Sequence, residues 1–282
     1  MTRRRQLLGV VLYRLDAWGV ALIVSLVAIL LHDALTPRAL ALAFGVAGLY
    51  AIGYAANDYF DAAADARDDT KARLNLFVAH PLTPARAGIL VGAALAVAAV
   101  PFLAYGMRGI AFLATGILAA WAYSAPPLRL KARPGLDLLT HAVFVQTFAY
   151  AMCLVLLDVE WKPVDAVVLG VNFLASLSGQ LAQQLRDFDL DSLGDRTFTT
   201  AMGTRIAAAC LRVVTGLLFA LVFAGVTTRL IPLSLAPLAL AFVPAALRRL
   251  RAERHVGFSP GAAVATGGAL LWVGVLLLID VT

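Results

Sequence analysis

The stretch Asn57–Asp65 reads NDYFDAAAD, and it directly follows an uncharged apolar segment, 39–56, that is typical of a membrane helix. In a helix that continues past residue 56, Asp58, Asp61 and Asp65 fall at positions i, i+3 and i+7, roughly on one face. Stacked carboxylates repel one another, and charges beside hydrocarbon are costly unless they are paired. The stretch therefore predicts a helix that leaves the membrane carrying acids that need cations.

The composition of the whole chain is that of a polytopic membrane protein. Of its 282 residues, 61% are hydrophobic and 14% are charged, and the mean hydropathy is +0.86, whereas a soluble domain has about 25% charged residues. We expect one all-α domain over residues 1–282, without a separate soluble domain. A membrane span needs about 20 mostly apolar residues, and nine segments qualify: 17–36, 39–56, 85–104, 109–124, 136–157, 164–186, 205–227, 232–247 and 260–280.

The distribution of basic residues supports these nine segments, because Lys and Arg accumulate in cytoplasmic loops. With a cytoplasmic N-terminus, most of the 23 basic residues fall on the cytoplasmic side. We therefore expect the N-terminus and the acid-rich loops to be cytoplasmic, and the Ala- and Arg-rich usage favours a bacterial inner membrane. Anionic headgroups of membrane lipids explain the net charge of +6, so we expect no nucleic-acid partner.

A second acid cluster follows the segment 164–186, on the same predicted side of the membrane. If that helix continues, Asp187, Asp191 and Asp195 fall at i, i+4 and i+8. Mg²⁺ takes oxygen ligands and typically combines one or two carboxylates with water and substrate phosphate oxygens. The alternatives are two merely solvated loops or a cation transporter, but a transporter needs carboxylates near the bilayer midplane. Acids at helix ends instead indicate a site at the cytoplasmic mouth of a cavity.

Cations stand beside the acids in a third loop, which reads YSAPPLRLK from Tyr123 to Lys131. Arg129 and Lys131 would lie on the same side of the membrane as both acid clusters. Lys acts as a point charge and Arg as a bidentate fork for phosphate oxygens. A diphosphate held by Mg²⁺ and these cations is therefore the favoured ligand.

These three stretches resemble the UbiA superfamily of intramembrane prenyltransferases. NDYFDAAAD matches that family's NDxxDxxxD motif at Asn57, Asp58, Asp61 and Asp65. RDFDLDSLGDRTFTTAMG is similar to its second aspartate motif, and YSAPPLRLK is similar to its Tyr-to-Lys loop element. The chain departs from the family pattern at His80, where many members have arginine, and in the spacing of Tyr123 and Lys131.

The resemblance implies nine transmembrane helices around a central cavity that is open to lipid and capped by cytoplasmic loops. It also implies Mg²⁺ and an isoprenyl diphosphate, and it assigns site residues by motif position. Asp61, Asp65, Asp187 and Asp191 would be the catalytic carboxylates, and the expected metal ligands are these four with Asp58 and Asp195. The expected substrate-binding residues are Asn57, Asp58, Tyr123, Arg129 and Lys131, with Lys71, Arg67 and Arg14 added on sequence position.

The implied reaction is transfer of an isoprenyl group to a lipophilic acceptor in the membrane. The diphosphate would ionise, and the acceptor would attack the allylic carbocation. The same motifs would also serve an intramembrane terpene cyclase, in which the double bonds of the prenyl chain attack the cation instead. A non-enzymatic transporter or lipid-binding scaffold is the third hypothesis, and it predicts metal binding without release of diphosphate.

Overall fold

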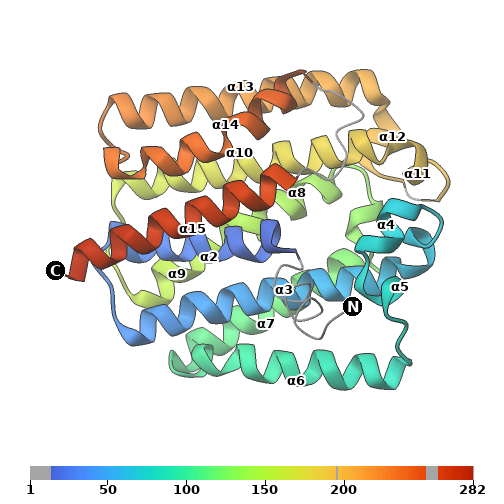
Figure 1. The fold of residues 1–282 in the computed structure, drawn as a ribbon, viewed down its shortest axis with the longest axis horizontal. Coiled ribbons are helices and arrows are strands. Elements are labelled where there is room, and N and C mark those ends of the chain that lie inside the picture. The colour runs from blue at the N-terminus through green and yellow to red at the C-terminus, as the bar shows by residue number, and fades with distance from the viewer. Residues whose placement is uncertain (1–13, 195, 252–259, 282) are drawn as a thin grey trace.

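The protein is a bundle of helices that run roughly along its long axis (Figure 1). The computed structural model describes residues 14–194, 196–251 and 260–281, and these residues contain helices and no strand. Four short helices gather at one end of the bundle; they are α4 (Asp69–Leu74), α5 (Leu76–Ala79), α11 (Phe188–Asp191) and α12 (Phe198–Met202). We call these four helices the caps. Both acidic motifs lie at this same end of the bundle.

Eight helical segments in the described residues are long and apolar enough to cross a membrane. They are α3 (Pro37–Asp65), α6 (Pro84–Leu103), α7 (Gly106–Ser124), the run α8–η2–α9 (Leu136–Leu157), α10 (Pro163–Arg186), α13 (Thr204–Thr227), η3–α14 (Leu233–Arg251) and α15 (Pro260–Val281). The prediction of an all-α, multi-pass membrane protein is confirmed. The first predicted span, 17–36, forms a shorter apolar helix, α2 (Leu15–Leu31), so the count of nine is not confirmed.

The α2 helix stops early because the chain turns sharply before α3. Asp33 adopts a left-handed conformation with φ 51°, which no regular helix continues. Thr36 then caps α3 by accepting a hydrogen bond from the Ala39 amide at 3.1 Å, and Pro37 occupies the first helical position. The same Thr-Pro signal starts α6 at Thr83 and Pro84.

The two acidic motifs end their helices differently. The α3 helix continues without interruption through Asp65, as the sequence predicts. The expected continuation of 164–186 is wrong, because α10 ends at Arg186 and Asp187 is already non-helical, with φ −91° and ψ 4°. The chain must turn there so that α12 can return to pack against α10. Asp187 and Asp191 therefore belong to a tight turn around α11.

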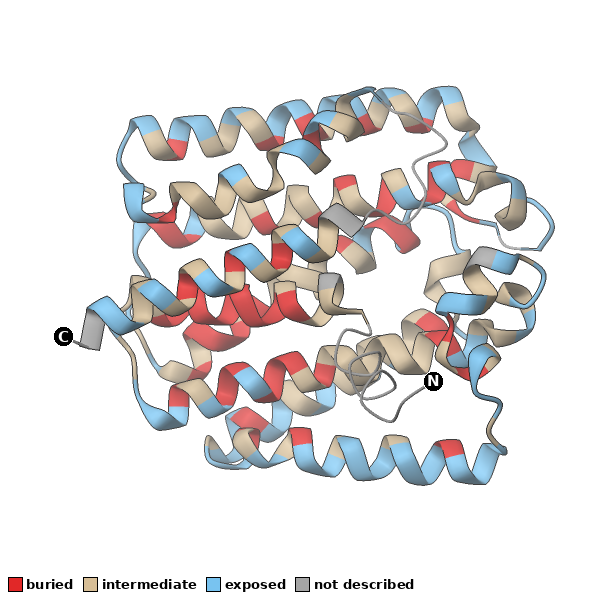
Figure 2. Ribbon diagram, viewed as in Figure 1, coloured by how far each residue is buried: buried red, intermediate tan, exposed pale blue. Residues whose placement is uncertain are grey.

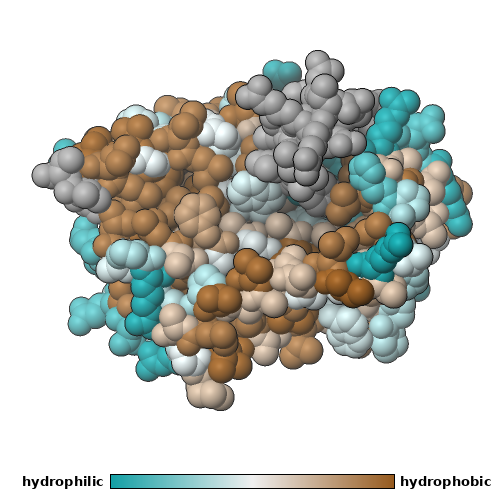
Figure 3. Space-filling model, turned by 60° about the horizontal axis from the view of Figure 1, so that its bottom comes forward, coloured by the Kyte–Doolittle hydropathy of each residue, from teal (hydrophilic) through white to brown (hydrophobic). Residues whose placement is uncertain are grey.

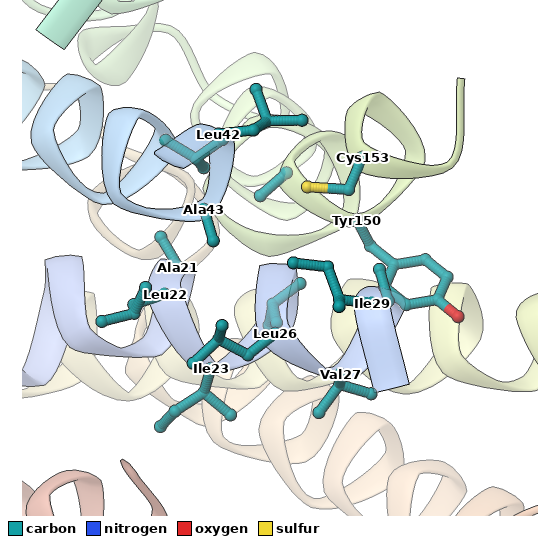
Figure 4. Close-up of a cluster of buried hydrophobic side chains, with 14 of the residues drawn as sticks. Ala21, Leu22, Ile23, Leu26, Val27, Ile29, Leu42, Ala43, Tyr150 and Cys153 are labelled. Carbon is teal, nitrogen blue, oxygen red and sulfur yellow. The ribbon is translucent and has the colours of Figure 1, made fainter. Parts of the chain in front are cut away.

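The core is built around α2, which packs against α3, α9 (Phe148–Leu157) and α15. Side chains from several faces of α2, such as the consecutive residues Ala21, Leu22 and Ile23, are buried (Figure 4). Cys153 lies in the same cluster as a free thiol, consistent with a packing role. The outer helices are exposed over much of their length (Figure 2), and many of their exposed side chains are apolar. Apolar residues also cover much of the face in Figure 3. This is the surface that lipid would cover.

A buried polar cluster joins three helices at the end of the bundle opposite the caps. The Asp165 carboxylate accepts a hydrogen bond from the Tyr150 hydroxyl at 2.6 Å and from the Lys162 amide at 2.6 Å. His32 Nε2 lies 3.0 Å from the same carboxylate. These contacts tie α2, α9 and α10 together, and Figure 4 shows the Tyr150 hydroxyl beyond the apolar cluster.

Close packing between α3 and α6 depends on a small residue. A Cβ atom at Gly45 would lie 3.0 Å from Pro101 Cγ and 3.2 Å from the Ala98 carbonyl oxygen. Small residues at such positions let membrane helices approach closely, which strengthens their van der Waals contact.

We expect Gly45→Leu to destabilise the protein by about 1–3 kcal/mol, because overpacking forces the two helices apart. The measurement is thermal unfolding of the purified protein in detergent. Gly92→Leu is the matched control, since a Cβ at Gly92 of α6 meets no atom within 4 Å. Equal melting temperatures of the two variants would contradict the close approach of α3 and α6.

Candidate functional site

A cavity of about 210 Å³ lies among α3, α7, α8–η2–α9 and α10. Its lining is amphipathic. Beside the caps it is polar, with Asn57, Asp61, Lys71, Lys131, Asp187 and Asp191; farther from them it is lined mainly by Leu49, Tyr50, Gly116, Phe144, Val145 and Phe148. From Leu49 to Asp61, α3 rises about 18 Å along this wall. A ligand with a charged head and an apolar tail matches this division.

The first motif meets the cationic loop at the polar end. Lys131 donates a hydrogen bond to the side-chain amide oxygen of Asn57 (Oδ1) at 2.9 Å and forms an ion pair with Asp61. The Arg129 guanidinium lies 3.6 Å from the same carboxylate. Ser124, at the end of α7, also donates to Asn57, at 3.0 Å. The loop that carries the two cations is thus fixed against α3.

The other two acids of the first motif do not line the cavity. Asp58 is fully buried and accepts hydrogen bonds from Arg14 at 2.6 Å and from the Leu76 amide at 3.3 Å. Asn75 donates to the Asp65 carboxylate and to the Asp58 backbone carbonyl, both at 2.8 Å. These contacts attach the α4–α5 cap to α3.

The second motif faces the first across the cavity. The Asp187 carboxylate lies 3.1 Å from Lys71 Nζ and accepts a hydrogen bond from Arg186 Nε at 2.9 Å. Asp187, Asp191 and Lys71 all line the cavity. Because Lys71 belongs to α4, its ion pair joins the caps that follow the two motifs.

The structure brings seven of the predicted site residues to one cavity: Asn57, Asp61, Lys71, Tyr123, Lys131, Asp187 and Asp191. Five others lie outside its lining: Arg14, Asp58, Asp65, Arg67 and Arg129. Arg67 is exposed beyond the end of α3, and His80 is exposed beyond α5. Asp195 lies outside the described residues.

A model of the UbiA prenyltransferase family matches residues 18–257 of the chain. The chain belongs to this family. Its fold is similar to that of a UbiA homologue from Archaeoglobus fulgidus bound to DMAPP and Mg²⁺, with 16% identity over 96% of this chain and 98% of that one and a TM-score of 0.75. The same homologue bound to GPP and Mg²⁺ gives 17% identity, the same coverages and a TM-score of 0.74.

An apo UbiA homologue from Aeropyrum pernix K1 is also similar, with 18% identity over 95% of this chain and 99% of that one and a TM-score of 0.69. A search of curated protein sequences gave no match. Family membership places the protein in the prenyltransferase class of enzymes, as the sequence predicts.

Two residues that sequence reasoning missed position the second motif of this UbiA-family protein. Asp137 is fully buried and accepts hydrogen bonds from Gln184 at 2.7 Å and from the Phe198 amide at 2.6 Å. Gln184 in turn accepts hydrogen bonds from the Thr199 amide and hydroxyl, at 3.1 and 3.0 Å. The network holds α12 against α10 and so fixes both ends of the turn that carries Asp187 and Asp191.

The polar end of the cavity offers carboxylate oxygens, which are ligands that Mg²⁺ prefers. Within the ranges that the structure describes, no three His, Cys, Asp or Glu side chains are close enough to form a metal site by themselves. Mg²⁺ does not need such a site, because it is usually held by one or two carboxylates together with phosphate oxygens and water. Asp61, Asp187 and Asp191 supply carboxylates to one cavity, so the residues fit the metal when a diphosphate completes the shell.

We expect Asp137→Ala to loosen the second motif, because it leaves buried Gln184 and Phe198 donors without an acceptor. Each such donor costs about 1–3 kcal/mol. Hydrogen–deuterium exchange across residues 187–200 measures the effect directly, and faster exchange there is the expected result. The control is Asp158→Ala, which removes a carboxylate exposed on the surface that pairs only with exposed Arg108. Unchanged exchange in Asp137→Ala would show that the network does not hold the turn.

Proposed function

We propose that the protein transfers an isoprenyl group from an isoprenyl diphosphate to a lipophilic acceptor within the membrane, with Mg²⁺ as cofactor. The observation that carries this proposal is the amphipathic cavity, which has acids from both motifs and two lysines, Lys71 and Lys131, at one end and an apolar, aromatic wall at the other. The relatives whose structures hold DMAPP or GPP with Mg²⁺ support it. Release of diphosphate in the presence of the acceptor would be the first sign of the reaction.

Asp61, Asp187 and Asp191 are the carboxylates that would hold Mg²⁺ directly or through water. Asp195 is proposed to extend this set. Asp65, held by Asn75, and Asp58, held by Arg14, are proposed to act as supporting ligands or as anchors of the cap. When bound, Mg²⁺ supplies a Lewis acid for the diphosphate oxygens.

The cations of the site neutralise the charge that develops on the leaving diphosphate. Lys131 and Lys71 line the polar end and supply ammonium donors, and Arg129 stands behind Lys131. Asn57 and Tyr123 add neutral polar groups to the same cavity. Fixed charges aimed at a leaving group lower the barrier to ionisation, since they require no reorganisation during the reaction. Arg67 would attract the donor near the cavity entrance, and Arg14 would orient Asp58.

The apolar wall protects the reacting carbon. As the bond between C1 of the isoprenyl group and the diphosphate oxygen breaks, its electron pair leaves with the diphosphate, and C1 becomes cationic. Phe144 and Phe148 lie in contact in the wall, with ring centroids 5.2 Å apart. Aromatic faces attract cations, and an apolar wall limits the water that would quench one.

The site is proposed to face the cytoplasm, with the N-terminus on the same side of a bacterial inner membrane. The basic loops support this orientation through the positive-inside rule. Membrane lipids would cover the exposed apolar face (Figure 3), and the acceptor would enter from them.

The deciding experiment measures diphosphate release by the purified protein in detergent with Mg²⁺. Geranyl, farnesyl and geranylgeranyl diphosphate are supplied in turn, with and without a membrane lipid extract, and the products are resolved by mass. We expect release that depends on the extract, yields a heavier prenylated product and stops when EDTA removes Mg²⁺. Release without extract, giving a cyclic product, would identify a terpene cyclase; no release with any donor would refute prenyl transfer from these donors.

Replacing Asp61 or Asp191 by Ala is expected to lower the rate of diphosphate release at least 100-fold, since even outer-shell partners of metal ligands are typically worth about 10–100-fold. The melting temperature of Asp191→Ala should stay close to that of the wild type, whereas Asp61→Ala also removes the partner of Lys131 and should melt earlier. Asp69→Ala is the matched control, because Asp69 begins α4, is exposed and does not line the cavity. Activity retained in both site variants would rule out the carboxylate clamp.

A further inference from the structure

His141 lines the cavity but belongs to neither aspartate motif. It belongs to α8 (Leu136–Ala142), lines the cavity one turn before Phe144, and lies beside Tyr123 with ring centroids 6.4 Å apart. Gln180 of α10 donates a hydrogen bond to the Tyr123 hydroxyl at 3.1 Å. These three polar side chains line the cavity next to its aromatic wall.

The hydrogen bonding of His141 leaves one nitrogen unused. The imidazole interacts with the backbone carbonyl of Ser176 on α10, whereas Nδ1 is buried and has no hydrogen-bond partner among the described residues. Nε2 is therefore the nitrogen that faces Ser176. Since a protonated Nδ1 would be a buried donor without an acceptor, the neutral tautomer with a proton on Nε2 and a lone pair on Nδ1 matches this arrangement.

The other bases at the cavity already have partners. Asp61 is paired with Lys131, and Asp187 is paired with Lys71 and Arg186. Of the cavity residues that the structure describes, His141 is the one with a buried polar side-chain atom that lacks any hydrogen bond. A buried polar atom of this kind calls for a ligand that can complete it.

Prenyl transfer releases a proton, and a base must take it up. The bond between C1 and the diphosphate oxygen breaks, the electron pair leaves with the diphosphate, and a new bond forms between C1 and an atom of the acceptor molecule. The acceptor molecule loses one hydrogen as a proton, from that atom or from a group conjugated to it, while the electrons of the broken bond stay with the product. No oxidant or reductant is required.

We propose that His141 is the general base of the reaction and that its Nδ1 takes the proton released by the molecule that is prenylated. Tyr123 and Gln180 position the group that carries this proton. The acceptor is accordingly of a class with an ionisable hydrogen at or conjugated to the reacting atom, such as a phenol or an alcohol. This inference rests on the proposed function and adds a residue that neither aspartate motif contains.

The test is chemical rescue of His141→Ala. The variant is assayed with farnesyl diphosphate, Mg²⁺ and membrane lipid extract, or with whichever donor the wild type uses, and the prenylated product is measured across a dilution series of the extract. We expect the rate at saturating extract to fall about 100-fold or more, which is the usual contribution of a general base. Added imidazole should raise the rate of His141→Ala at least tenfold, because a small base can occupy the space left by the side chain.

Two further measurements separate catalysis from structure. The melting temperature of His141→Ala and its affinity for inorganic diphosphate with Mg²⁺ should remain those of the wild type, since the phosphate-binding end is untouched. Leu139→Ala is the matched control, because Leu139 lies on the same helix, is exposed on the outside of the bundle and does not line the cavity. Its rate should be normal, with or without imidazole.

The outcomes distinguish this inference from the proposed function. A wild type that releases no diphosphate from any donor overturns both. An active wild type with an equally active His141→Ala variant overturns only the role of His141, and so does a slow variant that imidazole fails to accelerate. Rescue by imidazole in His141→Ala, and not in Leu139→Ala, supports proton transfer to Nδ1.

Discussion

The structure depends on how the negative charge at the end of α3 is compensated. Three aspartates within eight residues would repel one another beside an apolar bundle. Asp58 is paired with Arg14 and Asp61 with Lys131, while Asp65 accepts a hydrogen bond from Asn75. Each partner comes from a different part of the chain, so compensating the charge of this one helix end also brings together the start of α2, the α4–α5 cap and the short helix η1 (Leu130–Ala132).

The residues of the first motif lie on two different faces of α3. Residues four apart lie nearly on one line of a helix, so Asn57 and Asp61 face the cavity together. Asp58 and Asp65 are seven apart and share another line, which faces the cap. Asp61 lies about 60° from that line, so the sequence-based grouping of all three acids on one face is only approximate. One short motif thus contributes side chains both to the cavity and to the contacts with the α4–α5 cap.

Local patterns in the sequence predicted much of this arrangement. Hydropathy located the apolar segments, Thr-Pro pairs explain where α3 and α6 begin, and the three motifs do meet at one cavity. The predicted span 164–186 ends where α10 ends, but its expected helical continuation through Asp187 is wrong, because the return of α12 interrupts the helix. Asp137 could not be found from spacing, since its partners Gln184 and Phe198 are brought to it only by tertiary packing. His141 could not be identified from the sequence either, because it lies in a predicted apolar span and only the packing of the helices places it in the cavity.

The polar cluster at the far end of the bundle bears on how the protein is made. The α2 helix precedes α9 and α10 in the chain, and Asp165, the partner of His32, follows it by 133 residues. At a typical rate of about 5–20 residues per second, the ribosome needs on the order of ten seconds to produce that interval. During this time α2, short and buried on several faces in the finished protein, has neither α9 nor α10 beside it. The contacts of α2 with α9 and with Asp165 can therefore form only after residue 165 has been synthesised.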